Sequence, residues 1–576
     1  MRHLRAVTGR HLHFIVVVTL LAIWYTFPTI VHVFKTDSFW LPSGGSFDIY
    51  LHIWDKWYWQ QIFSGQADRM YTTALFYPQG LSLAHHPLSS LPTNIVQLVL
   101  QTILPVSNVF CFAYLLVIFL NAVSAYVYML WLFKQKWIAL IGAVVFGFSP
   151  HLITKPNQLH DATVAPIALA FYCFHRGIVE KRSRFIIFAG LLTGLTSTIT
   201  LYNFSCLLIS LAAGVCAFAI GRWRDSSYWA SIALLALTIA ASSIWAIGPM
   251  LSDSQLFDAA LGWHEQEVSN DLIYSLVNHR HPILGPLADS ALQIPPDLIR
   301  KEVSYLGYLP LLLIGIGLFR RDSGRKMIPW LALGLGFMIL KLGSTLSING
   351  VEYPQILLPK YYLNEIFPFV FKAFTATSRF HAGVLLPFTV LSCYGLYALI
   401  RARPAAPWSR IILLLIGLLA FEYYSPIYAT ATPYEQFEYL KWLDQEDDSD
   451  RIHLINLPMG RTNSKLYSLY QSLSGYPHAE GAISRAPDSA YDYIRANFVL
   501  KTWHKARPIN CFSTDRGDYK SAIRQLQKDS FSHIVHHRGL KRWETVLESF
   551  QYVEPAYTDD FVSVYRLTDL LDSCSR

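Results

Sequence analysis

The sequence contains little charge. Only 15% of its 576 residues are Asp, Glu, Lys or Arg, while 53% are hydrophobic, and soluble domains carry about 25% charged residues. This composition excludes an ordinary soluble protein. The formal net charge of +8 does not indicate nucleic-acid binding, because much of the Lys and Arg lies in short stretches between apolar blocks. In such stretches, basic residues orient a membrane protein.

Cysteine is also scarce, and the seven cysteines show no zinc-type spacing, which excludes the common structural zinc modules. Cys511 and Cys574 lie in the hydrophilic C-terminal part, and spacing alone does not decide whether these two pair. The others fall in apolar blocks, where a thiol acts as a small core side chain: Cys111, Cys173, Cys206, Cys216 and Cys393.

The N-terminal region lacks the small-residue cleavage site that ends a signal peptide. Arg2, Arg5 and Arg10 precede an apolar segment at 13–34, which contains bulky residues such as Trp24. We therefore expect this segment to remain as a first membrane span, with the N-terminus on the cytoplasmic side.

The apolar blocks predict a polytopic α-helical membrane protein with about eleven spans, since a helix needs about 20 residues to cross the hydrocarbon layer. Because cytoplasmic loops are enriched in Lys and Arg, the basic gaps are predicted to be cytoplasmic and the C-terminus outside. These gaps are 134–136, 176–184, 222–225, 320–326 and 401–410. After the first span, the predicted spans are 108–133, 137–153, 162–175, 185–201, 204–220, 229–250, 304–319, 327–347, 380–400 and 411–425.

Two regions follow from this pattern. Residues 1–431 form the predicted transmembrane domain, in which the apolar run at 92–104 is short for a span and suits an interfacial or re-entrant helix. Residues 432–576 are more hydrophilic and alternate helix-like with strand-like segments, which predicts a soluble extracytoplasmic α/β domain. The predicted outer loops of the first region are 35–107, 150–161, 251–303 and 348–379.

The first outer loop carries an acidic residue, Asp48, at the start of an aromatic stretch that includes Trp54. A carboxylate near the membrane surface is costly unless it is solvated or used. Taken alone, a helix-capping or first-turn role for Asp48 is as plausible as catalysis. Trp57 and Trp59 suit an aromatic belt at the membrane interface.

The second outer loop places His160 and Asp161 directly before a predicted span. Asp161 could cap the helix that begins at Ala162. A His-Asp pair can also bind a divalent cation or tune a base, although two residues are a weak metal signal. Because Asp48 and Asp161 both lie at helix ends on the outer face, together they favour a functional site more than either does alone.

Other polar residues are predicted on the same face. His85 and His86 follow the first aromatic stretch, and Tyr202 lies in a turn between two spans. Arg379 stands at a membrane entrance, where its planar guanidinium could bind a phosphate or simply extend to the interface from a helix end. Two further basic side chains, Lys372 and His381, lie close to it in sequence.

Segments along nearly the whole chain resemble bacterial membrane glycosyltransferases of the GT-C superfamily. Asp48 and Trp54 resemble the Gly-Asp-x-x-x-x-x-Trp pattern of its first loop, with Phe47 in place of the glycine, and FYPQGLSLAHH resembles the following Tyr-Pro-x-Gly element. Further landmarks follow in the same order: VVFGFSPHLI, TSTITLYNFSCLL, VSYLGYLPLLLIGIGL, FTATSRFHAGVLLPF, RIHLINLPMG and SLYQSLSGYPHAEG. Their order carries the resemblance more than any single segment.

The resemblance implies a transferase in a bacterial inner membrane. Its donor would be a sugar on a polyprenyl phosphate and its acceptor a glycan, a lipid or a protein, with inversion at the sugar carbon. One carboxylate takes the acceptor proton and a cation stabilises the leaving phosphate. Asp48 is then the candidate base, and Asp161 a supporting base or metal ligand. Arg379 would bind the phosphate with His381 or Lys372, and a Mg²⁺ or Mn²⁺ cofactor is left open.

Three alternatives remain at the level of sequence. A transporter or lipid flippase would require ionisable residues within the spans, whereas the acids gather at one face. A catalytically inactive relative would use its outer domain to bind glycan on a membrane scaffold. A ligase or polymerase of the O-antigen type would call for a large arginine-rich outer loop, and no such cluster occurs in the sequence.

Overall fold

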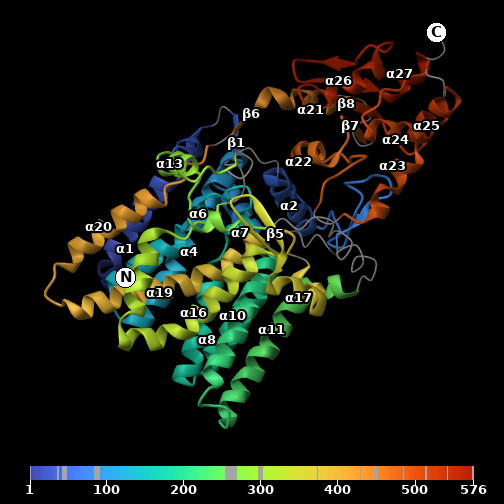
Figure 1. Ribbon diagram of the computed structural model, residues 1–576. Coiled ribbons are helices and arrows are strands. Elements are labelled where there is room, and N and C mark those ends of the chain that lie inside the picture. The colour runs from blue at the N-terminus through green and yellow to red at the C-terminus, as the bar shows by residue number, and fades with distance from the viewer. Residues whose placement is uncertain are drawn as a thin grey trace.

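The protein is mostly helical in its computed structural model (Figure 1). Five helical segments of the described chain are long and apolar enough to cross a membrane: Asn108–Phe133, Leu159–Glu180, Leu201–Ala219, Ser226–Ser252 and Thr377–Ala402. This fits a helical membrane protein. The structure describes residues 2–35, 38–41, 48–83, 91–252, 269–295, 303–372, 374–428, 430–446, 452–483, 486–512, 516–540 and 542–573.

A helix coincides with each segment that the sequence predicts as a span. Four of the apolar helical segments are shorter than a full crossing: Leu12–Thr26, Lys136–Gly147, Ser183–Ser197 and Tyr308–Leu318. The helices are α1 (Arg2–Thr26), α4 (Val106–Phe133), α5 (Lys136–Gly147), α8 (Ala165–Glu180), α9 (Ser183–Ser197), α10 (Leu201–Ala219), α11 (Ser226–Ser252), α15 (Tyr308–Leu318), α16 (Arg321–Leu342), α19 (His381–Ala402) and α20 (Trp408–Glu422).

Small residues allow a close contact between two helices of this bundle. Gly190 and Gly194 lie one turn apart on α9, and a Cβ added at either would stand within 2.6 Å of the side chain of Thr238 or Ser242 on α11. The Ser242 hydroxyl donates to the backbone oxygen of Gly190 at 3.2 Å. Glycine allows two membrane helices to approach this closely, because packing rather than the hydrophobic effect holds helices together in lipid.

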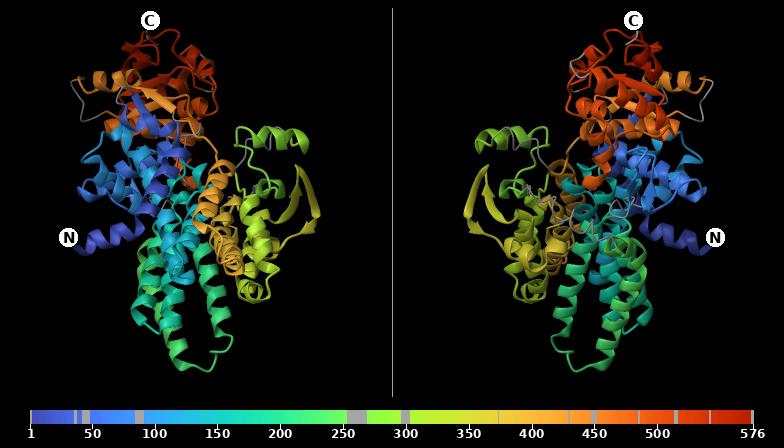
Figure 2. Two further views of the ribbon diagram at one scale, coloured as in Figure 1. Left: turned by 90° about the vertical axis from the view of Figure 1, so that its left-hand side faces the viewer. Right: turned by 90° about the vertical axis from the view of Figure 1, so that its right-hand side faces the viewer.

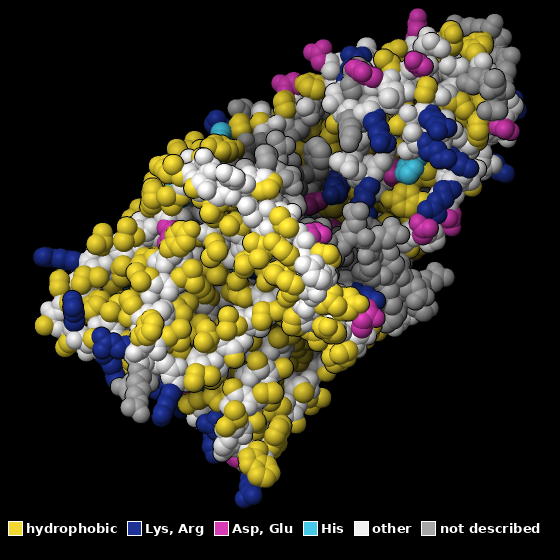
Figure 3. Space-filling view, in the orientation of Figure 1, with side chains coloured by type: hydrophobic (Ala, Val, Ile, Leu, Met, Phe, Trp, Pro, Cys, Tyr) yellow, Lys and Arg dark blue, Asp and Glu magenta, His cyan; other side chains and the backbone are white. Residues whose placement is uncertain are grey.

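The surface of the bundle is largely apolar, and Lys and Arg gather at the end that lies away from the C-terminus (Figure 3). Lys181 and Arg182, in the turn between α8 and α9, belong to this end and have side chains 73% and 51% exposed. Apolar sides with a basic end are typical of helices that cross a bilayer.

The C-terminal part contains a four-stranded sheet in the order β7-β8-β10-β9. β7 (Leu454–Leu457) runs parallel to β8 (His533–His537), and β10 (Val562–Arg566) pairs antiparallel with β8 and with the short β9 (Tyr557–Thr558). Strands thus occupy the strand-like segments of the sequence. The surrounding helices are α21 (Glu438–Leu443), α22 (Arg461–Ser474), α23 (Asp492–Ala496), α24 (Phe498–His504), α25 (Arg516–Lys528), α26 (Trp543–Leu547) and α27 (Leu567–Asp572).

The segment between α1 and α3 (Leu91–Gln101) packs against this C-terminal part, as both views of Figure 2 agree. Trp54 of α2 (Asp48–Phe63) shares a buried core with Ile455 of β7 and Trp503 of α24. The Trp54 indole also donates to the Gln471 side chain of α22 at 2.6 Å. The change in composition at 432 is therefore not a boundary in the packing.

Three two-stranded sheets complete the described fold. β1 (Ser38–Leu41) pairs antiparallel with β6 (Thr430–Pro433), which joins the segment after α1 to the segment after α20. β2 (Tyr71–Thr72) pairs with β3 (Leu81–Ser82), and β4 (Thr345–Ile348) pairs with β5 (Val351–Leu357). The short apolar run at 92–104 contains α3 (Leu91–Gln101), so the predicted helix exists there.

One prediction about a single residue is wrong, and one question about a cysteine concerns a residue that the structure does not describe. Trp59 is only 3% exposed and stacks on Trp245, so it belongs to the protein interior and not to an interfacial belt, whereas Trp57 is half-buried. Cys511 is buried, and Cys574, with which the sequence leaves its pairing undecided, lies outside the described residues.

Candidate functional site

Asp161 does not cap a span. It lies within the short helix α7 (Leu159–Ala162), and the N-cap residue of α8 is Val164. The side chain of Asn121, on α4, instead satisfies this helix start, because its Oδ1 accepts from the N–H groups of Val164 at 3.1 Å and Ala165 at 2.8 Å. The capping interpretation of Asp161 is therefore wrong, and its carboxylate is available for another role.

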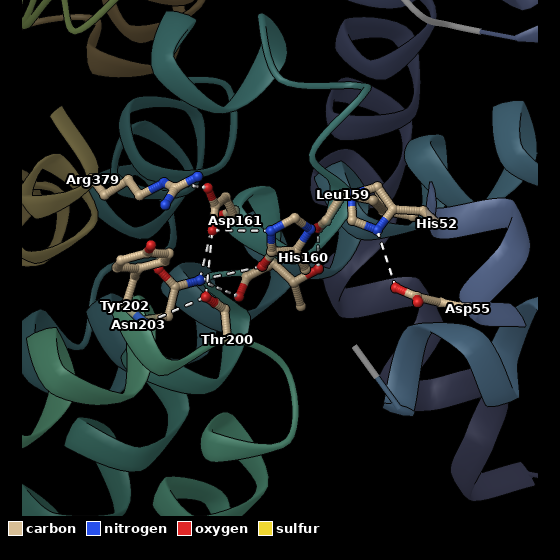
Figure 4. Close-up of polar contacts among 10 residues, drawn as sticks. His52, Asp55, Leu159, His160, Asp161, Thr200, Tyr202, Asn203 and Arg379 are labelled. Carbon is tan, nitrogen blue, oxygen red and sulfur yellow. Dashed lines mark hydrogen bonds and ion pairs between the residues drawn. The ribbon is translucent and has the colours of Figure 1, made fainter. Parts of the chain in front are cut away.

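That carboxylate forms an ion pair with Arg379, whose Nε lies 3.1 Å from Asp161 Oδ2. Arg379 lies in a 3₁₀ turn, Thr377–Phe380, directly before α19. The side chains are 4% and 18% exposed. The guanidinium also lies over the ring of Tyr202 with its central carbon 4.0 Å from the ring centroid, a cation–π contact. The predicted residues Asp161, Arg379 and Tyr202 thus come together from three segments (Figure 4).

Hydrogen bonds fix the backbone around Asp161. Asn203, in the first turn of α10, donates its side-chain N–H groups to the carbonyls of Asp161 at 3.3 Å and Thr163 at 3.2 Å. The Thr200 hydroxyl donates to Asp161 Oδ1 at 3.4 Å. The N-terminal ends of α8 and α10 are thereby joined, and the carboxylate is held at their junction.

Two histidines link this junction to the first outer loop. His160 Nε2 lies 3.5 Å from Asp161 Oδ1, and its ring centroid lies 4.5 Å from that of His52 on α2. On its other side, His52 Nδ1 lies 3.6 Å from Asp55. His52 follows Asp48 by one helical turn and acts electrostatically on its carboxylate, so the two predicted acids belong to one continuous polar region.

Asp48 lies in the first turn of α2, where the positive end of the helix dipole favours a carboxylate. Its Oδ1 accepts a hydrogen bond from Lys465 Nζ of α22 at 2.5 Å. Burial raises the pKa of the Asp48 carboxyl, but the hydrogen bond and charge of Lys465, with smaller contributions from His52, outweigh it. The pKa therefore lies below its ordinary value of 3.8. In this state Asp48 is ionised and a weak base.

A second set of basic side chains lies near the start of α19. His381 is fully buried, and its Nδ1 lies 3.4 Å from Lys341 Nζ of α16. Lys341 also donates to the Ser275 hydroxyl at 2.7 Å. Lys155, buried in the loop before α7, interacts electrostatically with both Asp161 and His381. Positive groups thus exceed carboxylates in this part of the described site, which suits an anionic ligand.

The other predicted residues lie elsewhere. Lys372 pairs with Glu365 at 3.6 Å, and no described contact joins it to Arg379. Trp54 is 1% exposed and serves the packing of α2 on α22. His85 and His86 lie outside the described residues.

Sequence reasoning missed Lys465, His52, Lys155 and Lys341. Lys465 lies in a hydrophilic helix that contains several other polar residues, so nothing local marks it. The sequence did indicate His52, because its spacing of four residues from Asp48 places both on the same face of a helix.

Whether the protein can hold the Mg²⁺ or Mn²⁺ ion left open by the sequence depends on the ligands that its side chains offer. No group of three His, Cys, Asp or Glu side chains within the described ranges is arranged to hold a metal ion. His160 and Asp161 offer two candidate ligands, fewer than a protein site for Mg²⁺ or Mn²⁺ usually supplies without substrate phosphates. The described residues do not by themselves fit a resident cation, and the chemistry proposed below uses none.

Comparison with known proteins assigns no family to this chain. No known family model matches the chain, and no curated protein matches it either.

Proposed function

We propose that the chain is a membrane glycosyltransferase of the GT-C type. It moves a sugar from a polyprenyl-phosphate donor to an acceptor at the outer face of a bacterial inner membrane. In this proposal all eleven helices that coincide with predicted spans cross the bilayer, the N-terminus is cytoplasmic, and residues 432–576 form an extracytoplasmic α/β domain.

The observation that carries the proposal is the convergence of Asp48, Asp161 and Arg379 in one polar region. They come from three segments that are distant in sequence, and the residues that connect them are buried or half-buried. Charged groups are costly to bury unless they are paired or used. Two acids and an excess of cations beside an apolar bundle suit a reaction between a lipid phosphate and a polar acceptor.

The proposed chemistry is a direct displacement. An acceptor hydroxyl oxygen attacks the anomeric carbon while the bond from that carbon to the phosphate oxygen breaks, so that the configuration inverts. The hydroxyl proton passes to the carboxylate of Asp48, and the leaving phosphate keeps the electron pair. Arg379 stabilises the charge that develops on this phosphate.

In this scheme Asp161 is a positioning residue. Its ion pair with Arg379 Nε and the stacking of the guanidinium on Tyr202 restrict the arginine to one orientation. Preorganised charge stabilises a transition state better than a flexible side chain, because no reorganisation is needed during the reaction. This role differs from the base or metal ligand that the resemblance implies for Asp161.

The test compares wild type with Asp48→Asn in detergent, using a panel of polyprenyl-phosphate sugars and following donor loss by mass spectrometry. Asp488→Asn serves as the control, since that carboxylate is 92% exposed in the C-terminal part. We expect donor loss in wild type and control and none in Asp48→Asn. Equal activity of Asp48→Asn would refute Asp48 as the base, and no consumption of any donor would refute the transferase.

A further inference from the structure

The helices α2 and α22 pack side by side and run in the same direction. Asp48 contacts Lys465 and Trp54 contacts Gln471, and both pairs have the same separation of 417 residues. An equal offset at two points along two helices means that they are parallel and in register. Their C-terminal ends therefore lie together, at the opposite end of the helix pair from the Asp48–Lys465 contact.

A cavity of about 580 Å³ lies where these two helices end. The last two turns of α2 form one wall and the end of α22 forms another, and residues 66–68 and 71–74 complete the lining. Sites for small molecules measure about 300–1,000 Å³. The cavity is therefore large enough for a small polar ligand.

Hydrogen bonds within the protein hold the walls of this cavity in place. The Tyr58 hydroxyl donates to the carbonyl of Asp68 at 2.8 Å, and the Thr72 hydroxyl accepts from the N–H of Ala74 at 3.1 Å. The Gln471 side chain of α22 donates to the Ala74 carbonyl as well. The end of α2, the loop that leads to β2 and the helix α22 are thereby joined, so the protein itself fixes the shape of the cavity.

Several side chains of the lining, by contrast, have no hydrogen-bond partner in the described part of the chain. These groups are the indole N–H of Trp57, the side-chain amides of Gln61 and Gln66, and the hydroxyl of Thr73. Trp57 and Gln61 are half-buried. Amides and hydroxyls both donate and accept hydrogen bonds, and the indole N–H donates. The cavity thus offers donors and acceptors together beside an aromatic ring.

The charge of the lining narrows the class of ligand. Asp68 is the one ionised group in the lining that the structure describes. Its carboxylate accepts from the N–H of Met70 at 2.6 Å, and no described Lys or Arg pairs with it. The neighbouring Arg69 instead stacks on Trp245 of α11, with 3.4 Å between its guanidinium carbon and the ring centroid. An anion would find no cation in this lining.

A neutral ligand with many hydroxyls matches these groups. Its hydroxyls can donate to the Asp68 carboxylate and to amide oxygens, and can accept from amide and indole N–H groups. The ring of Trp57 offers an apolar surface to the C–H groups of such a ligand and a polar N–H at its edge. Sugars combine hydroxyls with an apolar C–H face, so a sugar uses both parts of the lining.

We propose that this cavity binds a neutral sugar unit of a glycan. Trp57 supplies the apolar surface, and Gln61 and Asp68 hydrogen-bond to the sugar hydroxyls. Nine residues separate Asp48 from Trp57, which is about 14 Å along α2. The cavity therefore holds an acceptor glycan by a unit distant from the hydroxyl that reacts. This role rests on the proposed function, but the glycan-binding site itself does not.

The test measures binding to the purified full chain, in a detergent without a sugar headgroup. The probes are an array of neutral oligosaccharides built from hexoses, deoxyhexoses and N-acetylhexosamines, with choline as a cation and inorganic phosphate as an anion. Trp57→Ala removes the aromatic surface, and Gln61→Ala and Asp68→Asn change the hydrogen-bonding groups. Trp223→Ala is the matched control, because Trp223 is 64% exposed in the turn between α10 and α11. Thermal melting checks that each variant is folded.

We expect at least one neutral oligosaccharide to bind, with an affinity that does not change with salt because no ion pair forms. Trp57→Ala should weaken this binding by about tenfold, and Gln61→Ala and Asp68→Asn by severalfold each. Trp223→Ala should equal wild type. Choline and phosphate should not bind at this cavity.

Failure of every neutral oligosaccharide to bind, or equal binding by Trp57→Ala, Gln61→Ala and the control, would overturn the site. Choline binding that Asp68→Asn abolishes, without glycan binding, would assign the cavity to a cationic ligand instead. Gln61→Ala keeps the test decisive if Trp57→Ala does not fold, because the Gln61 side chain has no hydrogen-bond partner in the described chain to lose.

The outcome also separates this site from the proposed function. Glycan binding with the expected variant pattern but no donor consumption would keep the site and refute the transferase. If wild type transfers sugar to the bound oligosaccharide, Trp57→Ala should raise the KM for that acceptor without lowering kcat, since the cavity contacts the ground state and the transition state alike. Sugar transfer with unchanged KM and unchanged glycan binding in Trp57→Ala would keep the transferase and refute the site.

Discussion

Asp161 and Arg379 form a buried ion pair at 3.1 Å that joins the start of α8 to the start of α19. The two residues are more than 200 positions apart in sequence, and each is the nearest opposite charge of the other among the described residues. The pair therefore serves both the stability of the bundle and, in our proposal, the orientation of a phosphate-binding arginine.

Breaking this pair from either side should destabilise the protein strongly. Asp161→Asn and Arg379→Gln each remove the nearest counter-charge of a buried or largely buried group, so we expect each to lower the free energy of unfolding by about 3–5 kcal/mol. The double variant Asp161→Asn/Arg379→Gln should lose less than the sum. Denaturation in detergent measures all three. Additive losses would show that the two charges do not stabilise each other.

The Asp48–Lys465 contact predicts a pH dependence. Because the pKa of Asp48 is below its ordinary value of 3.8 in the folded protein, its ionisation stabilises the fold fully above that ordinary value. This stabilisation is lost as the pH falls through the lower folded pKa. Lys465→Gln should raise the pKa of Asp48. The acidic limb of the pH–rate profile should then move to higher pH.

The control for this shift is Lys441→Gln, which removes an exposed lysine and should leave the profile unchanged. An acidic limb at the same pH in Lys465→Gln and wild type would mean that Asp48 does not set it.

Substitution of Asn121 should affect the candidate site indirectly, through the backbone that this side chain holds. It accepts two backbone hydrogen bonds at the start of α8 and donates to the Ala162 carbonyl at 2.8 Å. Asn121→Ala leaves buried backbone groups unsatisfied, so we expect a loss of about 1–3 kcal/mol in stability. Asp161 precedes these groups directly and should lose its fixed position. Donor consumption should fall although Asn121 does not touch Asp161.

Asn121→Asp tests this further, because the aspartate keeps an acceptor for Val164 and Ala165 but loses the donor for Ala162. Its activity should lie between those of wild type and Asn121→Ala. If Asn121→Ala keeps full activity, Asp161 is positioned by Arg379 and Asn203 alone.

The close contact between α9 and α11 leaves no room for a larger side chain at Gly194. An added Cβ there would lie 2.5 Å from the Cβ of Ser242 and 2.8 Å from its backbone carbon. Gly194→Ala should therefore force the helices apart at a cost of about 1–3 kcal/mol. Gly417→Ala, on α20, is the control, since nothing lies within 4 Å of a Cβ at that position. Melting temperatures in detergent compare the two variants.

Local patterns in the sequence were sufficient for the apolar helices and for the main strands of the C-terminal sheet, but not for the three two-stranded sheets. The apolar blocks coincide with helices because a backbone in hydrocarbon must satisfy its own hydrogen bonds. The short segments at β8 and β10 form strands because their Ile and Val side chains pack well on a pleated surface, and the buried Leu-Ile-Asn-Leu of β7 pairs with β8. Asp48 was found from its position at the start of an aromatic helix, which is also a local property.

The sequence by itself determined which segments are apolar helices, which gaps are basic, and that two acids and an arginine stand at helix ends. Only the tertiary structure decided their partners. It assigned Asn121 rather than Asp161 to the start of α8, paired Asp161 with Arg379, and brought Lys465 of the C-terminal part to Asp48. Such pairs arise from the packing of elements far apart in the chain, and the short-range periodicity of a sequence contains no information about which distant helix ends meet.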